Sequence, residues 1–278
     1  MKAAPENPAV QAPLALVTGG GSGIGRELCK LFNRDGYRLV IVSLLEDELA
    51  SVKAELLAER PDADVLTIQQ DLSLPDAGEK LYASIRRRKI AVDVLVNNAG
   101  YGLWGDHFDI PFERIKSMLM LNMVTLTTLA TKFGAEMRER GSGGILNIGS
   151  TTSFQPLPYL AAYAATKHYV VAFSEALAEE MKGYGVTVTC VCPGTTATKF
   201  LETAGVQSSP TFGSVGYFAD KAAMSPVDVA RVAYEGLRAG QRKPIPGLSN
   251  WVHFLGSRLL PNRGMAWAMR QVYQVKGK

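Results

Sequence analysis

Short apolar runs alternate along the chain with segments whose apolar residues recur every three or four positions. The runs predict β-strands, and six are expected at residues 14–18, 38–43, 65–70, 92–96, 144–149 and 186–192. A seventh, short strand is expected at 243–246. The segments between the runs predict amphipathic helices, the longest of them at 112–140. This alternation predicts a doubly wound α/β domain, with about seven parallel strands covered by helices on both faces.

The same pattern divides the chain into three parts. Residues 1–13 carry three prolines and no apolar core of a secretion signal, so we expect a flexible leader. Residues 14–247 repeat strand and helix without a linker and predict one domain. Residues 248–278 carry two further apolar stripes and predict a helical extension packed on that domain. Residues 195–225 are rich in Gly, Ser, Thr and Pro, and their length predicts a functional loop such as a lid.

Composition narrows the class of protein. A chain of 278 residues with 47% hydrophobic content suits one large domain with an ample core. The net charge of +4 is too modest to predict a nucleic-acid partner, and no apolar run is long enough to span a bilayer. Cys29, Cys190 and Cys192 lack the spacing of metal ligands, so we expect reduced thiols, no metal site and a cytoplasmic location.

A glycine-rich turn stands between the first expected strand and the first expected helix, with Gly19, Gly23 and Gly25. Glycine allows close backbone approach, and the N–H groups of a helix N-terminus bind anions. The turn therefore predicts a site for the pyrophosphate of a dinucleotide. The end of the second strand should bind the adenosine ribose, but its signal is ambiguous. Ser43 suits a hydroxyl or a phosphate, and Glu46 also suits the start of a helix.

Tyr163 and Lys167 lie one turn apart on the same face of an expected helix. A phenol has an ordinary pKa of about 10, too high for a general base near neutral pH. A neighbouring ammonium is expected to lower that pKa. The pair therefore predicts a general acid/base for a hydroxyl or carbonyl substrate. Taken alone, the same spacing also describes an ordinary helix face with its lysine in water.

Several motifs, in order along residues 14–247, resemble those of the short-chain dehydrogenase/reductase family. They are the stretch from Thr18 to Gly25, Asp71, the stretch from Asn97 to Gly100, Asn122, Ser150, Tyr163 with Lys167, and Pro193-Gly194 followed by Thr198. Ser150 precedes Tyr163 by thirteen residues, the spacing usual in this family. The resemblance implies a Rossmann-type dinucleotide-binding and catalytic domain. It also implies an enzyme that transfers a hydride between NAD(P) and a carbonyl or secondary alcohol.

The resemblance further implies a role for each motif residue. Tyr163 would act as general acid or base, Lys167 would lower its pKa and hold the nicotinamide ribose, and Ser150 would hydrogen-bond the substrate oxygen. Asn122 would bend its helix and hold a water in a proton relay to Lys167. Asp71 would contact the adenine, although it also fits a turn cap. The implied cofactor site comprises Gly19, Ser22, Gly23, Ile24, Gly25, Ser43, Asp71, Asn98, Ala99, Gly100, Tyr163, Lys167, Pro193, Gly194 and Thr198.

The second strand departs from both cofactor patterns of the family. Members that take NADP often carry arginine where Leu44 stands, and members that take NAD often carry aspartate where Ser43 stands. Because no acid stands at residue 43 to repel a 2′-phosphate, the resemblance slightly favours NADP over NAD. It also implies a homodimer or homotetramer formed through long helices, including residues 161–181.

The residues expected to face the substrate are apolar and aromatic. They are Leu103, Trp104, Phe154, Leu157, Tyr159, Phe200 and Phe212. We expect a hydrophobic ketone or secondary alcohol as substrate, and the alternative is that these side chains pack a lid on itself. Two other functions remain open: a non-catalytic nucleotide-binding module, and an epimerase or dehydratase of related fold. The intact Ser150, Tyr163 and Lys167 argue against the first, and the glycine spacing and chain length argue against the second.

The C-terminal residues 236–278 contain no Asp or Glu but eight Lys and Arg. The simplest interpretation is a pair of terminal helices that pack on the domain with their arginines in water. The alternative is a basic amphipathic surface, which attaches to anionic lipid or attracts an acidic carrier or substrate.

Overall fold

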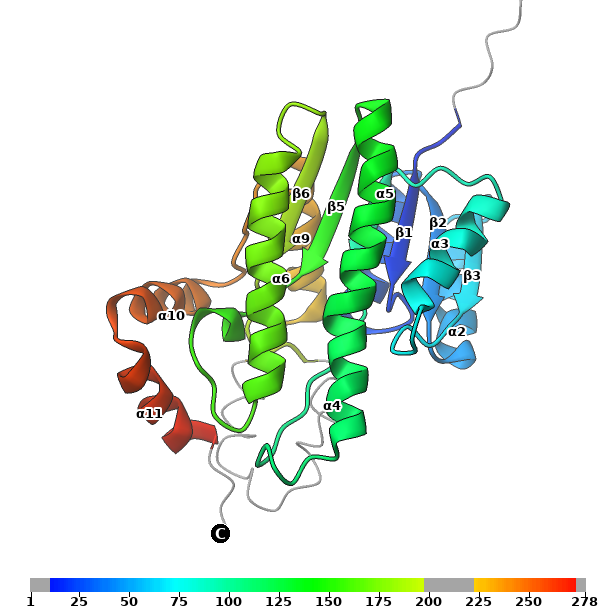
Figure 1. Ribbon diagram of the computed structural model, residues 1–278. Helices are drawn as coiled ribbons and strands as arrows, with labels where there is room; N and C mark the ends of the chain where they lie inside the picture. Colours follow the sequence, from blue (N-terminus) through cyan, green and yellow to red (C-terminus); the bar gives the residue numbers. More distant parts are fainter. Residues whose placement is uncertain (1–10, 198–222, 274–278) are drawn as a thin grey trace, which may run out of the picture.

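The computed structural model describes residues 11–197 and 223–273, which form one parallel sheet of six strands (Figure 1). The strands are β1 (Leu14–Thr18), β2 (Arg38–Ser43), β3 (Val65–Gln69), β4 (Val94–Asn97), β5 (Gly143–Ile148) and β6 (Val186–Val191). Their order across the sheet is β3-β2-β1-β4-β5-β6. The order of the strands across the sheet therefore reverses between β1 and β4. In sheets of this kind, ligands bind outside the carboxyl ends of the strands at this point.

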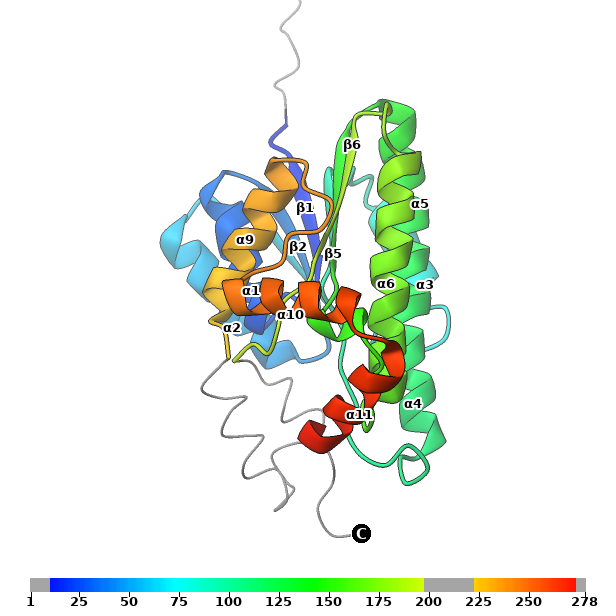
Figure 2. The same ribbon diagram turned by 90° about the vertical axis from the view of Figure 1, so that its left-hand side faces the viewer.

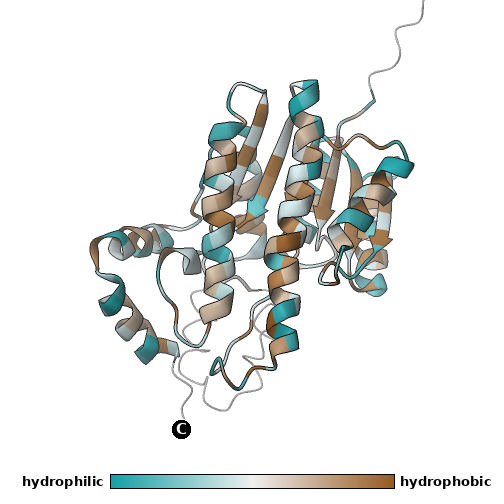
Figure 3. Ribbon diagram, in the orientation of Figure 1, coloured by the Kyte–Doolittle hydropathy of each residue, from teal (hydrophilic) through white to brown (hydrophobic). Residues whose placement is uncertain are grey.

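Helices cover both faces of the sheet (Figure 2). One face carries α1 (Gly23–Arg34), α2 (Glu46–Glu59) and α9 (Pro226–Arg238), and the other carries α3 (Ala77–Arg87), α5 (Leu126–Arg140) and α6 (Ala161–Glu180). Each layer of helices closes its own hydrophobic core against the strands. The central strands are thus buried on both sides, which explains their continuous apolar runs, drawn in brown in Figure 3.

The seventh strand expected at 243–246 is wrong for the described residues, although this segment runs beside β6. The N–H groups of Cys190 and Cys192 donate to carbonyl oxygens in and just before the segment, at 2.8 and 2.9 Å. A parallel ladder also needs return bonds from the N–H groups two residues further along. The residues at those positions are Pro244 and Pro246, which have no N–H to donate. The sheet therefore has six strands instead of about seven.

The long helix expected at 112–140 is divided by a wider turn. It consists of α4 (Phe112–Leu119), the π-helical turn η1 (Met120–Thr125) and α5. The side chain at the centre of η1 is Asn122, which is buried. Because π-helical turns are rare and are frequent at functional sites, this one draws attention to Asn122.

Two helices close the described chain at one edge of the molecule, beyond β6 and α6 (Figures 1 and 2). They are α10 (Leu248–Leu259) and α11 (Asn262–Tyr273). The inner side of α10 packs against the short 3-10 helix η2 (Thr151–Phe154), where the rings of Phe154 and Phe254 lie 4.7 Å apart between centroids. Across the described ranges, no helix is both long and apolar enough to cross a membrane.

Candidate active site

Four of the motif segments lie at the ends of four neighbouring strands, β1, β4, β5 and β6. The glycine-rich turn follows β1, Asn98 to Gly100 follow β4, Ser150 follows β5, and Pro193 and Gly194 follow β6. Because the strands are parallel, their carboxyl ends meet at one edge of the sheet. Because the paired strands are aligned side by side, the fold brings together segments that are up to about 175 residues apart in the sequence.

The glycine-rich turn brings two backbone segments so close together that no side chain fits between them. A Cβ at Gly25 would lie 2.3 Å from the carbonyl oxygen of Gly19, and Gly19 itself has a φ of +63°. The first turn of α1 contains no acidic residue, and the hydroxyl of its N-cap Ser22 makes no capping hydrogen bond. Within α1 itself, neither an acid in the first turn nor the N-cap side chain therefore occupies the N–H groups that open the helix. This cradle fits the pyrophosphate of a dinucleotide.

Asn98 braces the turn from the neighbouring strand. Its side-chain amide donates to the carbonyl oxygens of Thr18 and Gly19, at 3.0 Å each. The Thr18 hydroxyl in turn accepts from the N–H groups of Asn98 and Ala99 and donates to the carbonyl of Val96. These bonds fix the loop after β4 to the loop after β1. The Asn98 amide therefore acts on the cradle itself, and the cofactor contact implied for Asn98 stays a prediction.

Next to the end of β2, the first turn of α2 places a carboxylate beside the cradle. The sequence did not mark this carboxylate, that of Glu48, as a site residue. The Ser43 hydroxyl donates to Oε2 of Glu48 at 3.4 Å, and a Cβ at Gly21 would lie 2.8 Å from the Glu48 Cβ. Glu48 lies in the first turn of α2 with Glu46 and Asp47, where acids favour the helix dipole. The expected ribose site is therefore more acidic than Ser43 alone indicates.

Tyr163 is buried near the start of α6, and the side chain of Ser150 lies close enough to its phenol to influence its pKa. Burial raises the pKa of the Tyr163 phenol, while the Ser150 side chain lowers it and the nearby Tyr273 raises it again. The net direction is upward, opposite to the lowering expected from Lys167. The reason is that removing a phenolate from water costs more than the Ser150 side chain returns.

Lys167 lies below Tyr163 on α6, with Nζ 5.9 Å from the centre of the Tyr163 ring. Its ammonium donates to the carbonyl oxygen of Ile148 at 2.7 Å. Burial lowers the pKa of Lys167 from its ordinary value to about 8. Burial therefore disfavours the charged form of both groups. The phenol stays protonated near neutral pH, and the ammonium is destabilised.

Both polar atoms of the Asn122 side chain form hydrogen bonds within the same site. Nδ2 donates to the carbonyl of Tyr101 at 2.9 Å and to the Thr166 hydroxyl at 3.1 Å, and Oδ1 accepts from the N–H of Tyr101 at 3.2 Å. A Cβ at Gly100 would lie 2.9 Å from Oδ1 of Asn122 and 3.8 Å from Nζ of Lys167. Asn122 thus locks α6 and the loop after β4 around the lysine. A proton relay through it stays a prediction.

Two of the expected cofactor contacts occupy the rim of the site. Oδ1 of Asp71 accepts from both the N–H and the hydroxyl of Ser73, at 2.8 and 2.7 Å, which is the turn cap named above as the alternative. Gly194 is covered by α10, because a Cβ there would lie 2.4 Å from Oδ1 of Asn250. Thr198, Phe200 and Phe212 fall outside the described residues.

On the substrate side, Leu103 is buried in one cluster with Tyr163. Trp104 follows it, and its indole N–H donates to the carbonyl oxygen of Tyr273 at 3.3 Å. Phe154 packs against α10, as described above, and its contact with the substrate stays a prediction. Tyr273 could not be selected as a site residue from the sequence, because it lies 110 positions after Tyr163 and belongs to no motif. Only the fold brings the end of α11 to the site.

The comparisons with known proteins agree with this arrangement. The family model of the short chain dehydrogenases matches residues 13–208. A probable oxidoreductase of Mycobacterium tuberculosis, EphD, is 34% identical over 199 residues, which are 71% of this chain and 33% of that protein. The very-long-chain 3-oxoacyl-CoA reductase of Bos taurus is 35% identical over 189 residues, which are 66% of this chain and 60% of that protein.

A similar solved structure is that of a short-chain dehydrogenase from Sphingobium yanoikuyae in complex with NADPH. It has a TM-score of 0.76 and 29% sequence identity, and the match covers 96% of this chain and 98% of that one. The match to the mycobacterial and bovine relatives spans less than two thirds of their own length. The likeness to the Sphingobium protein extends over the whole fold.

Proposed function

The chain belongs to the short-chain dehydrogenase/reductase family, and we propose that it is an oxidoreductase that transfers a hydride between NAD(P) and a carbonyl or secondary alcohol. The observation that carries the proposal is the buried Tyr163, with Ser150 beside its phenol, Lys167 one turn below and the glycine cradle alongside. A hydrophobic core does not need a buried phenol, hydroxyl and ammonium together at a ligand site. A non-catalytic nucleotide-binding module does not need them either.

When bound, the nicotinamide would supply the hydride or accept it. Ser150 would hydrogen-bond the substrate oxygen and hold it against the phenol. Tyr163 would give its proton to that oxygen as the negative charge develops, and Lys167 would favour the phenolate that remains. Because burial keeps the phenol protonated near neutral pH, the site is set to donate a proton. In the reverse direction the phenolate would accept that proton from the alcohol.

We propose that both dinucleotides are accepted, with a slight preference for NADP. The absence of an acid at residues 43 and 44 supports this preference, as does the NADPH named with the Sphingobium structure. Glu48 acts against it, because its carboxylate would face a 2′-phosphate near Ser43. The preference is therefore smaller than the sequence of β2 alone suggests.

The substrate that we propose is an apolar ketone or the corresponding secondary alcohol. The buried Leu103 beside Tyr163, and the contact that ties Trp104 to Tyr273, support a wall of large apolar side chains. The long acyl chain named for the bovine relative supports the same class. An acyl thioester with a 3-oxo group is one member of it.

We also propose a cytoplasmic homodimer or homotetramer. The three cysteines are free and buried, which suits a reducing compartment. The long helices α5 and α6, which cover one face of the sheet, would form the interface between copies. Light scattering from the purified protein checks the number of copies.

The proposed function is tested by measuring the oxidation of NADPH and NADH with a panel of ketones, from short polar ones to long apolar ones. We expect cofactor consumption to depend on the ketone and to be fastest with the long apolar members. Faster turnover of the polar members would contradict the substrate class. Consumption of neither cofactor with any ketone, despite cofactor binding, would favour the alternatives of a binding module or an epimerase.

A further inference from the structure

Exposed apolar side chains are concentrated in the two C-terminal helices. Within the described ranges, sixteen large apolar side chains are exposed, and eight of them lie between residues 248 and 273. They are Leu248, Trp251, Val252, Leu255, Leu259, Leu260, Trp267 and Val272, and we call them the outer face of α10 and α11. Residues 248–273 are about a tenth of the described chain but carry half of its exposed large apolar side chains. The outer face is therefore a concentration of such side chains and not a few scattered ones.

The exposed residues of α10 form a continuous stripe. Leu248, Val252, Leu255 and Leu259 follow one another at intervals of three and four residues, which places them on one side of the helix. The opposite side is already occupied, because Phe254 packs on Phe154 and Asn250 covers Gly194. The helix is therefore apolar on both sides. A helix that needs only to pack on its own domain would carry polar residues outside.

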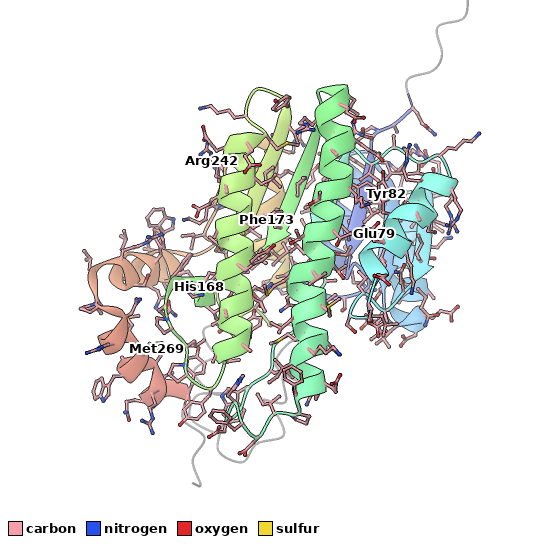
Figure 4. All side chains as sticks on the ribbon, in the orientation of Figure 1. Glu79, Tyr82, His168, Phe173, Arg242 and Met269 are labelled. Carbon is pink, nitrogen blue, oxygen red and sulfur yellow. The ribbon has the colours of Figure 1, made fainter. Side chains whose placement is uncertain are left out.

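The charge of the outer face has a single sign. Arg258, Arg263 and Arg270 are exposed on α10 and α11, and neither helix contains an acid. In the described part of the chain, none of these three arginines forms an ion pair with a carboxylate, whereas six of the other ten exposed arginines do. Side chains of both helices project from the edge of the molecule in Figure 4, where Met269 marks α11.

We propose that the outer face of α10 and α11 docks onto an anionic lipid surface. Leucine, valine and tryptophan would enter the interfacial region, and the arginines would meet the lipid phosphates. Charge selects this occupant over a second copy of the chain. A symmetric pair would bring the same acid-free face against itself and oppose arginine to arginine, which disfavours pairing. The proposal concerns binding alone and does not depend on the reaction proposed above.

The test is flotation of the purified full-length protein with vesicles of phosphatidylcholine, alone or mixed with phosphatidylglycerol. We expect binding to the anionic vesicles at low salt, at least about tenfold stronger than to phosphatidylcholine alone, and a steep loss at high salt. Binding that is equal on both vesicles, or absent from the anionic ones at low salt, would overturn the proposal.

Two matched pairs of variants locate the surface. Arg263→Gln with Arg270→Gln should weaken binding about thirtyfold, whereas Arg87→Gln with Arg88→Gln removes the same charge at the opposite edge and should change it little. Leu255 and Leu74 are similarly exposed, at 50% and 54%, on these two edges. Leu255→Asp should weaken binding at least about tenfold, and Leu74→Asp should not.

Light scattering distinguishes docking to lipid from pairing with a second copy of the chain. If the protein is an oligomer that Leu255→Asp dissociates while vesicle binding is absent, then a second copy covers the outer face and the proposal fails. If both variants of a pair weaken vesicle binding equally, the binding comes from net charge or general stickiness, and the proposal also fails. Thermal unfolding of each variant confirms that the compared proteins are folded.

Discussion

At the scale of single residues, burial is the strongest influence on the site. It raises the pKa of the Tyr163 phenol and lowers the pKa of the Lys167 ammonium to about 8. The sequence places the two groups one turn apart and thereby predicts their pairing, but it does not show how deeply they are buried. The charged form of each group is therefore less stable in this site than on an exposed helix face.

Lys167→Met should stabilise the protein near neutral pH while removing activity. Between about pH 8 and the ordinary lysine value of 10.5, the unfolded chain binds more protons than the folded one, so the stability of the wild type rises with pH through this window. Below it, burying the ammonium costs about 3 kcal/mol, partly offset by the bond to Ile148. We expect the variant to be more stable by about 1 kcal/mol near neutrality.

Urea unfolding without cofactor, near neutral pH and again at about pH 10, measures this difference. The advantage of Lys167→Met should shrink at the higher pH, because the wild-type lysine is then neutral in the folded state. A variant that is less stable by the same amount at both pH values would show that the Ile148 hydrogen bond outweighs burial.

Glu48→Gln should shift the choice of cofactor toward NADPH. Removing one negative charge beside Ser43 relieves repulsion of a 2′-phosphate, and we expect NADPH binding to improve about fivefold relative to NADH. Fluorescence titration with each dinucleotide gives the two dissociation constants. Glu46→Gln is the control, because Glu46 is exposed in the same turn of α2. An equal change for both dinucleotides in Glu48→Gln would show that Glu48 does not face the 2′ position.

At the scale of elements, the cradle depends on a contact between two backbones. Gly25→Ala would bring a methyl group within 2.3 Å of the Gly19 carbonyl, so the turn has to shift. We expect both dinucleotides to bind at least about tenfold more weakly, with the fold kept. Gly256→Ala on α10 is the matched control, because a Cβ there meets nothing within 4 Å. Unchanged titrations of the Gly25 variant would mean that the cradle does not hold the pyrophosphate.

Most elements were predictable because buried parallel strands leave a strong apolar signal. The bounds of β1 and β2 agree with the expected ranges residue for residue. The seventh strand failed for a reason present in the sequence, since Pro244 and Pro246 remove both return donors. The π-helical turn at Asn122 was not predictable in detail, because it depends on where the Asn122 amide finds partners in α6 and after β4.

At the scale of the whole molecule, the site depends on contacts between distant segments. The motif residues were found in sequence because each belongs to a local pattern, and the parallel sheet then brings their loops together. Tyr273 and Glu48 were missed because nothing local marks them. Their place beside Trp104 and Ser43 follows from the path of α11 and the start of α2. The direction of the apolar stripes in the C-terminal helices likewise depends on which side meets η2.

The proposed reaction is a net hydride transfer in which Tyr163 supplies or accepts the proton. The most direct measurement follows deuterium from reduced, deuterated nicotinamide into the product of an apolar ketone, in the wild type and in Tyr163→Phe. The account predicts one deuterium in each product alcohol, matched by oxidised cofactor. It also predicts a loss of at least about a thousandfold in Tyr163→Phe with cofactor binding intact. Transfer that persists in the variant, or bound cofactor that never yields labelled product, would contradict it.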